Sequence, residues 1–212
     1  MTVKRPGSAK TSEPPPELRE TPRDRIVRAT IQCIERFGVS GATVRRIAAA
    51  AGVNVAAINY YYGTKDRLLE AALAQTLEEA FPRALGELVE SIANHGGNVI
   101  AGTRAFFRGY LPNAFRYPRV SVAHLRDALL EQDYSGPAVT SARDFVEDFA
   151  AVVSPAMPHA TEREKHLAVI HVWASLFTLA MLPGLFQTPP ESLSGEQMVA
   201  QLLATLFGAR GH

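Results

Sequence analysis

Apolar residues recur at helical spacing from Thr21 to the end of the chain, and no segment alternates between polar and apolar positions as a half-buried strand does. The periodic segments are separated by glycines, prolines and residues that cap helices. This pattern predicts helices over residues 22–37, 44–51, 55–62, 65–80, 83–93, 98–116, 119–131, 138–153, 162–182 and 195–207. The predicted fold class is therefore all-α.

Short polar side chains stand where several of these helices begin. Those that can accept a hydrogen bond from the first helical turn are Thr21, Thr43, Asn54 and Thr64. Gly38 and Gly63 follow the last apolar positions of their segments, where glycine commonly ends a helix. Thr161 with Glu164, and Ser194 with Gln197, have the spacing of a capping box.

Two of the predicted helices are short and meet at Gly52-Val53-Asn54, between Thr43 and Lys65. This is the layout of a helix-turn-helix, whose second helix enters the major groove of DNA. Helical spacing predicts that the inward-facing residues are Val44, Ile47, Ala48, Ala51, Ile58, Tyr61 and Tyr62. The same spacing predicts that the outward-facing residues of the second helix are Val55, Ala56, Asn59 and Tyr60.

Residues 1–20 are rich in proline and small polar residues and contain few large apolar ones, which predicts a disordered tail. Lys4, Arg5 and Lys10 in this tail could form an arm that contacts DNA. We expect a helix-turn-helix domain over residues 21–67 and a second helical domain over residues 68–212.

The formal net charge of +1 conceals an uneven distribution. Residues 21–67 contain eight basic and three acidic side chains, whereas the chain from Leu68 onward contains ten basic and fifteen acidic ones. A basic N-terminal part on an acidic body is what a protein that binds a polyanion would show.

Other classes of protein receive no support from the sequence. Cys33 is the single cysteine, so neither a disulfide framework nor a thiolate metal site is predicted, and a cytoplasmic location fits best. The most apolar run, residues 168–182, is shorter than the roughly 20 residues that a spanning helix needs. His166 and His171 are wrongly spaced for a shared metal. We find no catalytic motif, and we expect neither a cofactor nor an enzyme.

Residues 21–70 resemble the DNA-binding domain of the TetR (tetracycline-repressor) family of bacterial regulators. The resemblance rests on Phe37-Gly38, on residues 43–48 (TVRRIA), on Ala51-Gly52-Val53, and on residues 58–65 (INYYYGTK) followed by Leu68-Leu69. It implies that DNA phosphates are held by Thr43, Tyr60, Thr64 and Lys65, and that base edges are met by Val55, Ala57 and Asn59.

The sequence departs from the family at Val55, where a polar or basic residue is frequent, and at Asn59, where tyrosine is frequent. Asparagine can pair with adenine, and Val55 and Ala57 can touch thymine methyl groups, which favours an A·T-containing half-site. Of the two adjacent arginines, we expect Arg45 to contact phosphate and Arg46 to be solvated.

For the rest of the chain, the resemblance implies a homodimer formed through helices 162–182 and 195–207 and a pocket for a small-molecule effector. Candidate lining residues are Phe106, Phe107, Tyr110, His124, Phe149 and Trp173. Aromatic residues at helical spacing are also what an ordinary core contains. The expected function is that of a homodimeric repressor released from its operator by the effector. The alternatives are a helical ligand-binding protein or enzyme that retains a DNA-binding domain, and a DNA-binding protein indifferent to sequence.

Overall fold

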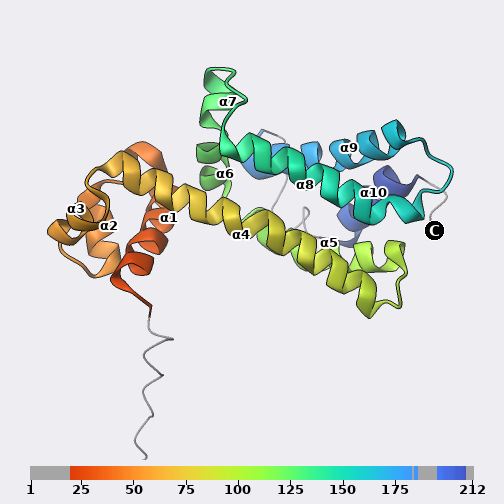
Figure 1. Ribbon diagram of the computed structural model, residues 1–212, viewed down its shortest axis with the longest axis horizontal. Helices are drawn as coiled ribbons and strands as arrows, with labels where there is room; N and C mark the ends of the chain where they lie inside the picture. Colours follow the sequence, from red (N-terminus) through yellow and green to blue (C-terminus); the bar gives the residue numbers. More distant parts are fainter. Residues whose placement is uncertain (1–19, 183, 186–194, 209–212) are drawn as a thin grey trace, which may run out of the picture.

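The computed structural model describes residues 20–182, 184–185 and 195–208, and every regular element in these ranges is a helix. The predicted all-α fold is thus confirmed (Figure 1). The proposed tail contacts of Lys4, Arg5 and Lys10 and the predicted cap at Ser194 lie outside the described residues. No helix in the described part combines the length and hydropathy that crossing a membrane requires.

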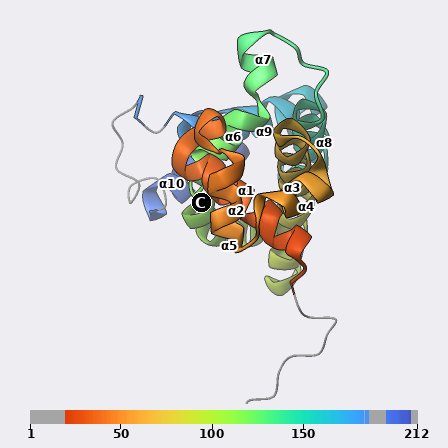
Figure 2. The same ribbon diagram turned by 90° about the vertical axis from the view of Figure 1, so that its left-hand side faces the viewer.

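Three helices form a compact unit at one end of the molecule, which we call the head (Figures 1 and 2). They are α1 (Pro22–Gly41), α2 (Val44–Ala51) and α3 (Val55–Tyr62). The predicted break of the first helix at Gly38 is present, because this residue takes a non-helical conformation with φ 71° and ψ 171°, and one further turn then ends at Gly41. Thr21 and Asp24 cap α1 reciprocally.

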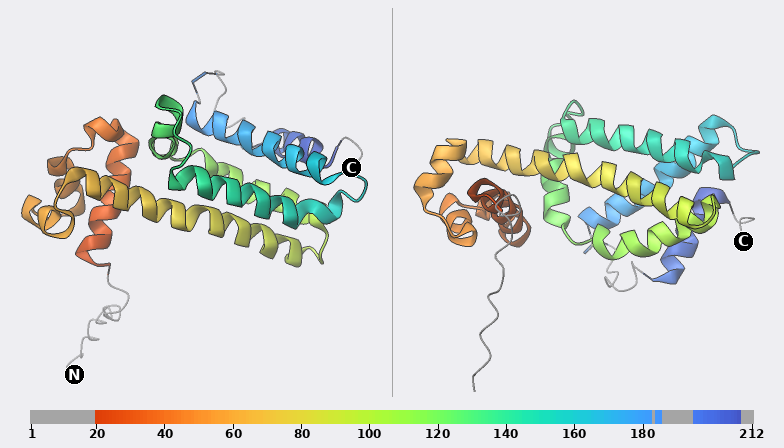
Figure 3. Two further views of the ribbon diagram at one scale, coloured as in Figure 1. Left: turned by 45° about the horizontal axis from the view of Figure 1, so that its top comes forward. Right: turned by 60° about the horizontal axis from the view of Figure 1, so that its bottom comes forward.

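The body consists of the helices that follow α4. They are α5 (Val99–Ala114), α6 (Pro118–His124), α7 (Arg126–Leu130), α8 (Pro137–Val153), the 3₁₀ turn η2 (Ser154–Ala156), α9 (Glu162–Met181) and α10 (Glu196–Phe207). Figure 3 shows α5 and α8 lying along α4; α9 packs against α8, and α10 packs against α5 and α9. The predicted capping box of Thr161 and Glu164 is present at the start of α9.

The helix α4 (Lys65–Asn94) joins head and body, and here the sequence-based prediction was wrong. We expected one helix to end before Pro82 and another to begin after it, because proline removes a backbone donor and crowds the preceding turn. The structure instead has one continuous helix. Packing on both sides of the proline accounts for this: Leu68 and Ala72 are buried in the head, and Ala84 and Leu88 in the body.

The predicted helix 119–131 was also wrong, because it is two short helices separated at Leu125 (φ −102°, ψ 11°). Val120 on α6 is buried in the core of the head. By contrast, α7 projects away from the bundle, with Leu129 and Leu130 exposed (Figure 1). The chain changes direction between these two environments, and neither glycine nor proline marks the turn.

Two hydrophobic cores hold the described structure together. The core of the head contains Ile26, Ile34, Ile47, Ile58 and Leu68, each at most 1% exposed. The core of the body is built largely from aromatic side chains on α5, α8 and α9. Because α4 contributes to both cores, this helix couples the head to the body.

Candidate nucleic-acid interface

The geometry of α2 and α3 follows from local capping. The Thr43 hydroxyl accepts a hydrogen bond from the Arg46 N–H (3.3 Å), which starts α2. Gly52 adopts the left-handed conformation (φ 64°) that ends α2 and that non-glycine residues adopt only at a cost. The Asn54 side chain then accepts a hydrogen bond from the Ala57 N–H (2.7 Å) and starts α3. All three elements were predicted from the sequence.

The inner face of this unit fixes α3 against the rest of the head. Ile47, Ala48 and Ala51 of α2 and Ile58 and Tyr62 of α3 are buried, as predicted. The Tyr62 hydroxyl donates to the backbone carbonyl of Arg23 (3.5 Å). A recognition helix must be held in place by its supporting residues, and these contacts supply that support.

The prediction that Tyr61 lies in the core was wrong. Its side chain is 43% exposed, and its ring meets that of Tyr60 edge to face at 5.2 Å between centroids. Ile58 and Tyr62 lie one turn apart and occupy the inward face of α3, whereas Tyr61 lies at the flank of that face. The correction adds Tyr61 to the side chains that a partner of the head can reach.

The outer face of α3 is available to a partner. Val55 is 39% exposed and Tyr60 is 84% exposed, and Asn59 is exposed between them. Ala57, the third predicted base-reading residue, is half-buried. The amide of Asn59 is therefore the polar group at the centre of this surface that can both donate and accept hydrogen bonds.

The structure distinguishes the two neighbouring arginines. Arg46 donates to the Gly41 carbonyl (2.8 Å) and lies over the Phe37 ring, 4.7 Å from its centroid, so this arginine fastens the end of α1. Arg45 is exposed, and no side-chain hydrogen bond or ion pair engages it within the described residues. Arg45 is the one of the pair that is free to meet a phosphate.

Lys65 is more constrained than its sequence position indicated. Its ammonium group donates to the backbone carbonyl of Val39 (3.0 Å), and the side chain is half-buried. Because an ammonium has three donors, two remain after this contact. The hydroxyls of Thr43 and Thr64 accept cap hydrogen bonds and keep their own protons for donation. Thr43 and Arg45 lie at the start of α2, and Thr64 and Lys65 lie at the start of α4, where backbone N–H groups also attract anions.

A contact between head and body was not foreseen from the sequence. The Glu35 carboxylate accepts hydrogen bonds from the backbone N–H groups of Arg119 (3.0 Å) and Val120 (3.2 Å). In return, the Arg119 guanidinium donates to the Arg36 carbonyl (2.9 Å). No local pattern signals this pairing, since the partners are more than 80 residues apart. It fixes α6 to α1.

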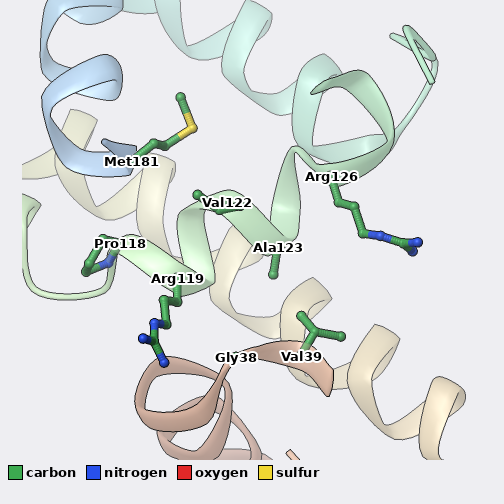
Figure 4. Close-up of a pocket in the computed structure, with 8 residues that line it drawn as sticks. All are labelled: Gly38, Val39, Pro118, Arg119, Val122, Ala123, Arg126 and Met181. Atoms are coloured by element: carbon green, nitrogen blue, oxygen red, sulfur yellow. The ribbon is translucent and has the colours of Figure 1, made fainter. Parts of the chain in front are cut away.

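A groove of about 360 Å³ lies at this junction, between the end of α1, α6 and the end of α9 (Figure 4). It is lined by Gly38, Val39, Pro118, Arg119, Val122, Ala123, Arg126 and Met181. The groove includes Arg119, so anything that fills it meets the contact that holds the head to the body.

The candidate effector-binding residues do not all come together. Phe106, Phe107, Phe149 and Trp173 are buried side by side in the body, with Tyr110 half-buried beside them. His124 lies elsewhere, on α6, where its Nε2 is 2.7 Å from the Thr76 hydroxyl of α4. Burial lowers the pKa of His124 to about 4, so the imidazole is neutral at pH 7. Its grouping with the aromatic residues was wrong because α6 packs against the core of the head through Val120 and Ala123.

Comparison with known proteins bears on this head. Residues 26–72 match the family model of the bacterial regulatory proteins of the tetR family. The transcriptional regulator BetI 1 of Chromohalobacter salexigens is 39% identical over 83 residues, which cover 38% of this chain and 41% of that protein. The chain thus aligns with less than half the length of this relative, and with 29% and 28% of two further BetI regulators.

Solved structures extend the likeness to the body. A transcriptional regulator from Rhodococcus sp. RHA1 superposes with a TM-score of 0.62 at 22% identity, covering 88% of this chain and 96% of that one. The multidrug-binding protein EbrR, complexed with imidazole, gives a TM-score of 0.55 at 21% identity, covering 89% and 96%. At these identities the likeness concerns the fold. Residues 26–72 thus match the tetR family of bacterial regulatory proteins, and the described chain shares the helical fold of these solved regulators.

Proposed function

We propose that the protein is a homodimeric transcriptional repressor that leaves its operator when a small molecule binds to the body. The observation that carries the proposal is the exposed face of α3, centred on Asn59, on a helix that its caps and buried residues hold rigidly. The relatives that match the head are transcriptional regulators, and one structural neighbour is described as multidrug-binding, which supports both parts of the proposal.

We assign two sets of contacts on DNA. Phosphates are bound by Thr43, Arg45, Tyr60, Thr64 and Lys65, which position the head, and bases are read by Val55, Ala57 and Asn59. Tyr61 joins the first set because its exposed ring lies against that of Tyr60. A dimer presents two such heads, and the half-sites of its operator are then about 34 Å apart, one turn of DNA.

Asn59→Ala is expected to reduce selectivity for the operator. If Asn59 makes a bidentate contact to adenine, its loss costs on the order of 1–3 kcal/mol on the true site and little on unrelated DNA. The measurement is selection of binding sites from random duplexes with the wild-type protein, followed by titration of both proteins on the selected and a scrambled site. Arg45→Ala is the matched control and should weaken both duplexes alike.

Three outcomes would contradict the proposal. Failure of the wild-type protein to enrich any sequence would indicate the sequence-indifferent alternative. Equal losses on both duplexes for Asn59→Ala would reject its role in base reading. Turnover of a metabolite that neither substitution affects would favour the enzyme alternative.

The proposed dimer interface involves α9 and α10. On α10, Val199, Leu202 and Leu203 are buried within the protomer against α5 and α9. On the outer face of α9, Leu167 is 41% exposed, and Ala174, two turns further on, is also exposed. This face of leucine and small residues is where we place the second protomer, in an isologous contact.

Leu167→Glu is expected to convert the dimer to monomers and to reduce operator affinity by at least tenfold, because it places paired carboxylates near the two-fold axis. The measurement is light scattering coupled to size-exclusion chromatography, together with operator titration. Leu129→Glu on α7 introduces the same side chain at a position that is also exposed and should leave the dimer intact. A dimer that survives Leu167→Glu would refute this interface.

A further inference from the structure

The buried core of the body contains an indole N–H without an acceptor. Trp173 is 1% exposed, and its Nε1 has no hydrogen-bond partner in the described part of the structure. Indole nitrogen can only donate, so rotation of a proton does not relieve the mismatch. Unpaired buried donors are rare in folded proteins, because an unmade hydrogen bond destabilises the folded state.

Aromatic rings surround this indole on several sides. Those of Phe145, Phe149, Tyr110, Phe177 and Phe107 have centroids 4.7, 5.3, 5.5, 5.9 and 6.3 Å from that of Trp173. Together with Phe81 and Phe106 we call them the aromatic cluster. A phenylalanine at position 173 would place an aromatic ring in this site without an unpaired donor. The indole is therefore better explained by a partner that arrives from outside the chain.

The surroundings limit the chemistry of that partner. The buried side chains of the described residues include no charged group, and the only buried polar ones are Thr30 in the head and Thr103 in the body. Thr103, one turn before Phe107 on α5, likewise has an unpaired hydroxyl. Burial raises the pKa of Tyr110 to about 12, so its hydroxyl stays neutral and able to donate. The charged group that acts on Tyr110 is the exposed Glu87, so a ligand charge within the buried cluster would lack a buried counterion.

The side of the cluster that faces α4 is the less enclosed one. Phe81 and Phe177 are only partly buried, and the Phe81 ring stacks on Phe145 at 4.9 Å between centroids. Phe81 immediately precedes Pro82, where the helical hydrogen-bond ladder of α4 is interrupted. Displacement of these two rings would open the cluster toward Trp173.

We infer that the aromatic cluster binds a neutral, largely apolar or aromatic molecule with a hydrogen-bond acceptor, such as a ketone or ether oxygen, that pairs with Trp173 Nε1. The inference rests on the proposed function only in that we take this molecule to be the effector. Binding itself can be measured without DNA, so the two proposals can fail separately.

The test compares benzophenone with diphenylmethane, two molecules of similar shape of which only the first has a carbonyl acceptor. We expect benzophenone to bind the full-length wild-type protein about tenfold more tightly in calorimetry, the effect of one buried hydrogen bond. Trp173→Phe should remove this preference while retaining affinity for diphenylmethane. The unliganded Trp173→Phe protein loses an unpaired donor but gains a cavity, and its melting temperature is recorded to show that it is folded.

Thr103→Val, which removes the second unpaired hydroxyl without changing side-chain volume much, is the control and should keep the preference. Equal affinity for the two molecules, or binding of neither, would overturn the inference. So would a preference that persists in Trp173→Phe. Tighter binding of benzyltrimethylammonium than of benzophenone would also overturn it, since the rings would then act through cation–π attraction on a charged ligand.

Discussion

Ile47→Ala is expected to unfold the head while leaving the body folded. Ile47 is fully buried on α2, and truncation of such a side chain costs about 2–5 kcal/mol. The core of the head, which would bear this loss, is small. Its other buried isoleucines are Ile26, Ile34 and Ile58. Operator affinity should be lost, and hydrogen exchange should show reduced protection in α1–α3 with protection retained in α8 and α9.

Phe149→Ala provides the reciprocal test. Phe149 is also fully buried, at the centre of the body, and its truncation costs about 3–5 kcal/mol. Protection should then fall in α5, α8 and α9, where its neighbours Phe106 and Trp173 lie. If either substitution lowered protection equally in both halves, head and body would form one cooperative unit, contrary to the proposed domain division.

Gly102→Ala is expected to destabilise the body by about 1–3 kcal/mol, the range found for overpacked cores. A β-carbon at position 102 would lie 2.5 Å from Cα and 2.7 Å from Cγ1 of Ile92, so α5 and α4 would have to separate. Urea unfolding monitored by circular dichroism measures the change. The α4–α5 contact also includes the hydrogen bond from the Ser91 hydroxyl to the Gly102 carbonyl.

Gly109→Ala on the same helix is the control, because a β-carbon there meets nothing within 4 Å. Alanine is favoured over glycine in a helix interior by up to about 1 kcal/mol, so this variant should be more stable than the wild type. Opposite signs for the two substitutions would show that the close approach of α4 and α5 constrains Gly102. Stabilisation by both would contradict the packing described above.

The parts of the structure that could be predicted from the sequence depend on local interactions. Thr43, Asn54 and Thr64 cap their helices through atoms three residues away, so the residues alone specify the contact. Burial of Ile47 and Ile58 follows from helical periodicity in the same way. The head therefore agreed closely with expectation, apart from Tyr61 at the edge of the inward face.

The parts that were missed depend on residues far apart in the sequence. Continuity of α4 through Pro82 requires cores on both sides of it, and the break at Leu125 requires the head as a partner for Val120. Likewise, the contacts of Glu35 with α6 and of Lys65 with Val39 join segments that no periodicity relates. The exposed surface that we propose to face DNA could be predicted better than the contacts that connect it to the body.

Pro82 divides α4, the helix that joins head and body, into two arms that can bend relative to each other. At 1.5 Å per residue, the segment from Lys65 to Pro82 is a lever arm of about 26 Å. A bend of about 5° at its pivot displaces the far end by about 2 Å, more than half the 3.4 Å rise of one base pair. Since Phe81 beside the pivot packs against the aromatic cluster, a shift of one ring can be amplified into loss of register with the DNA groove.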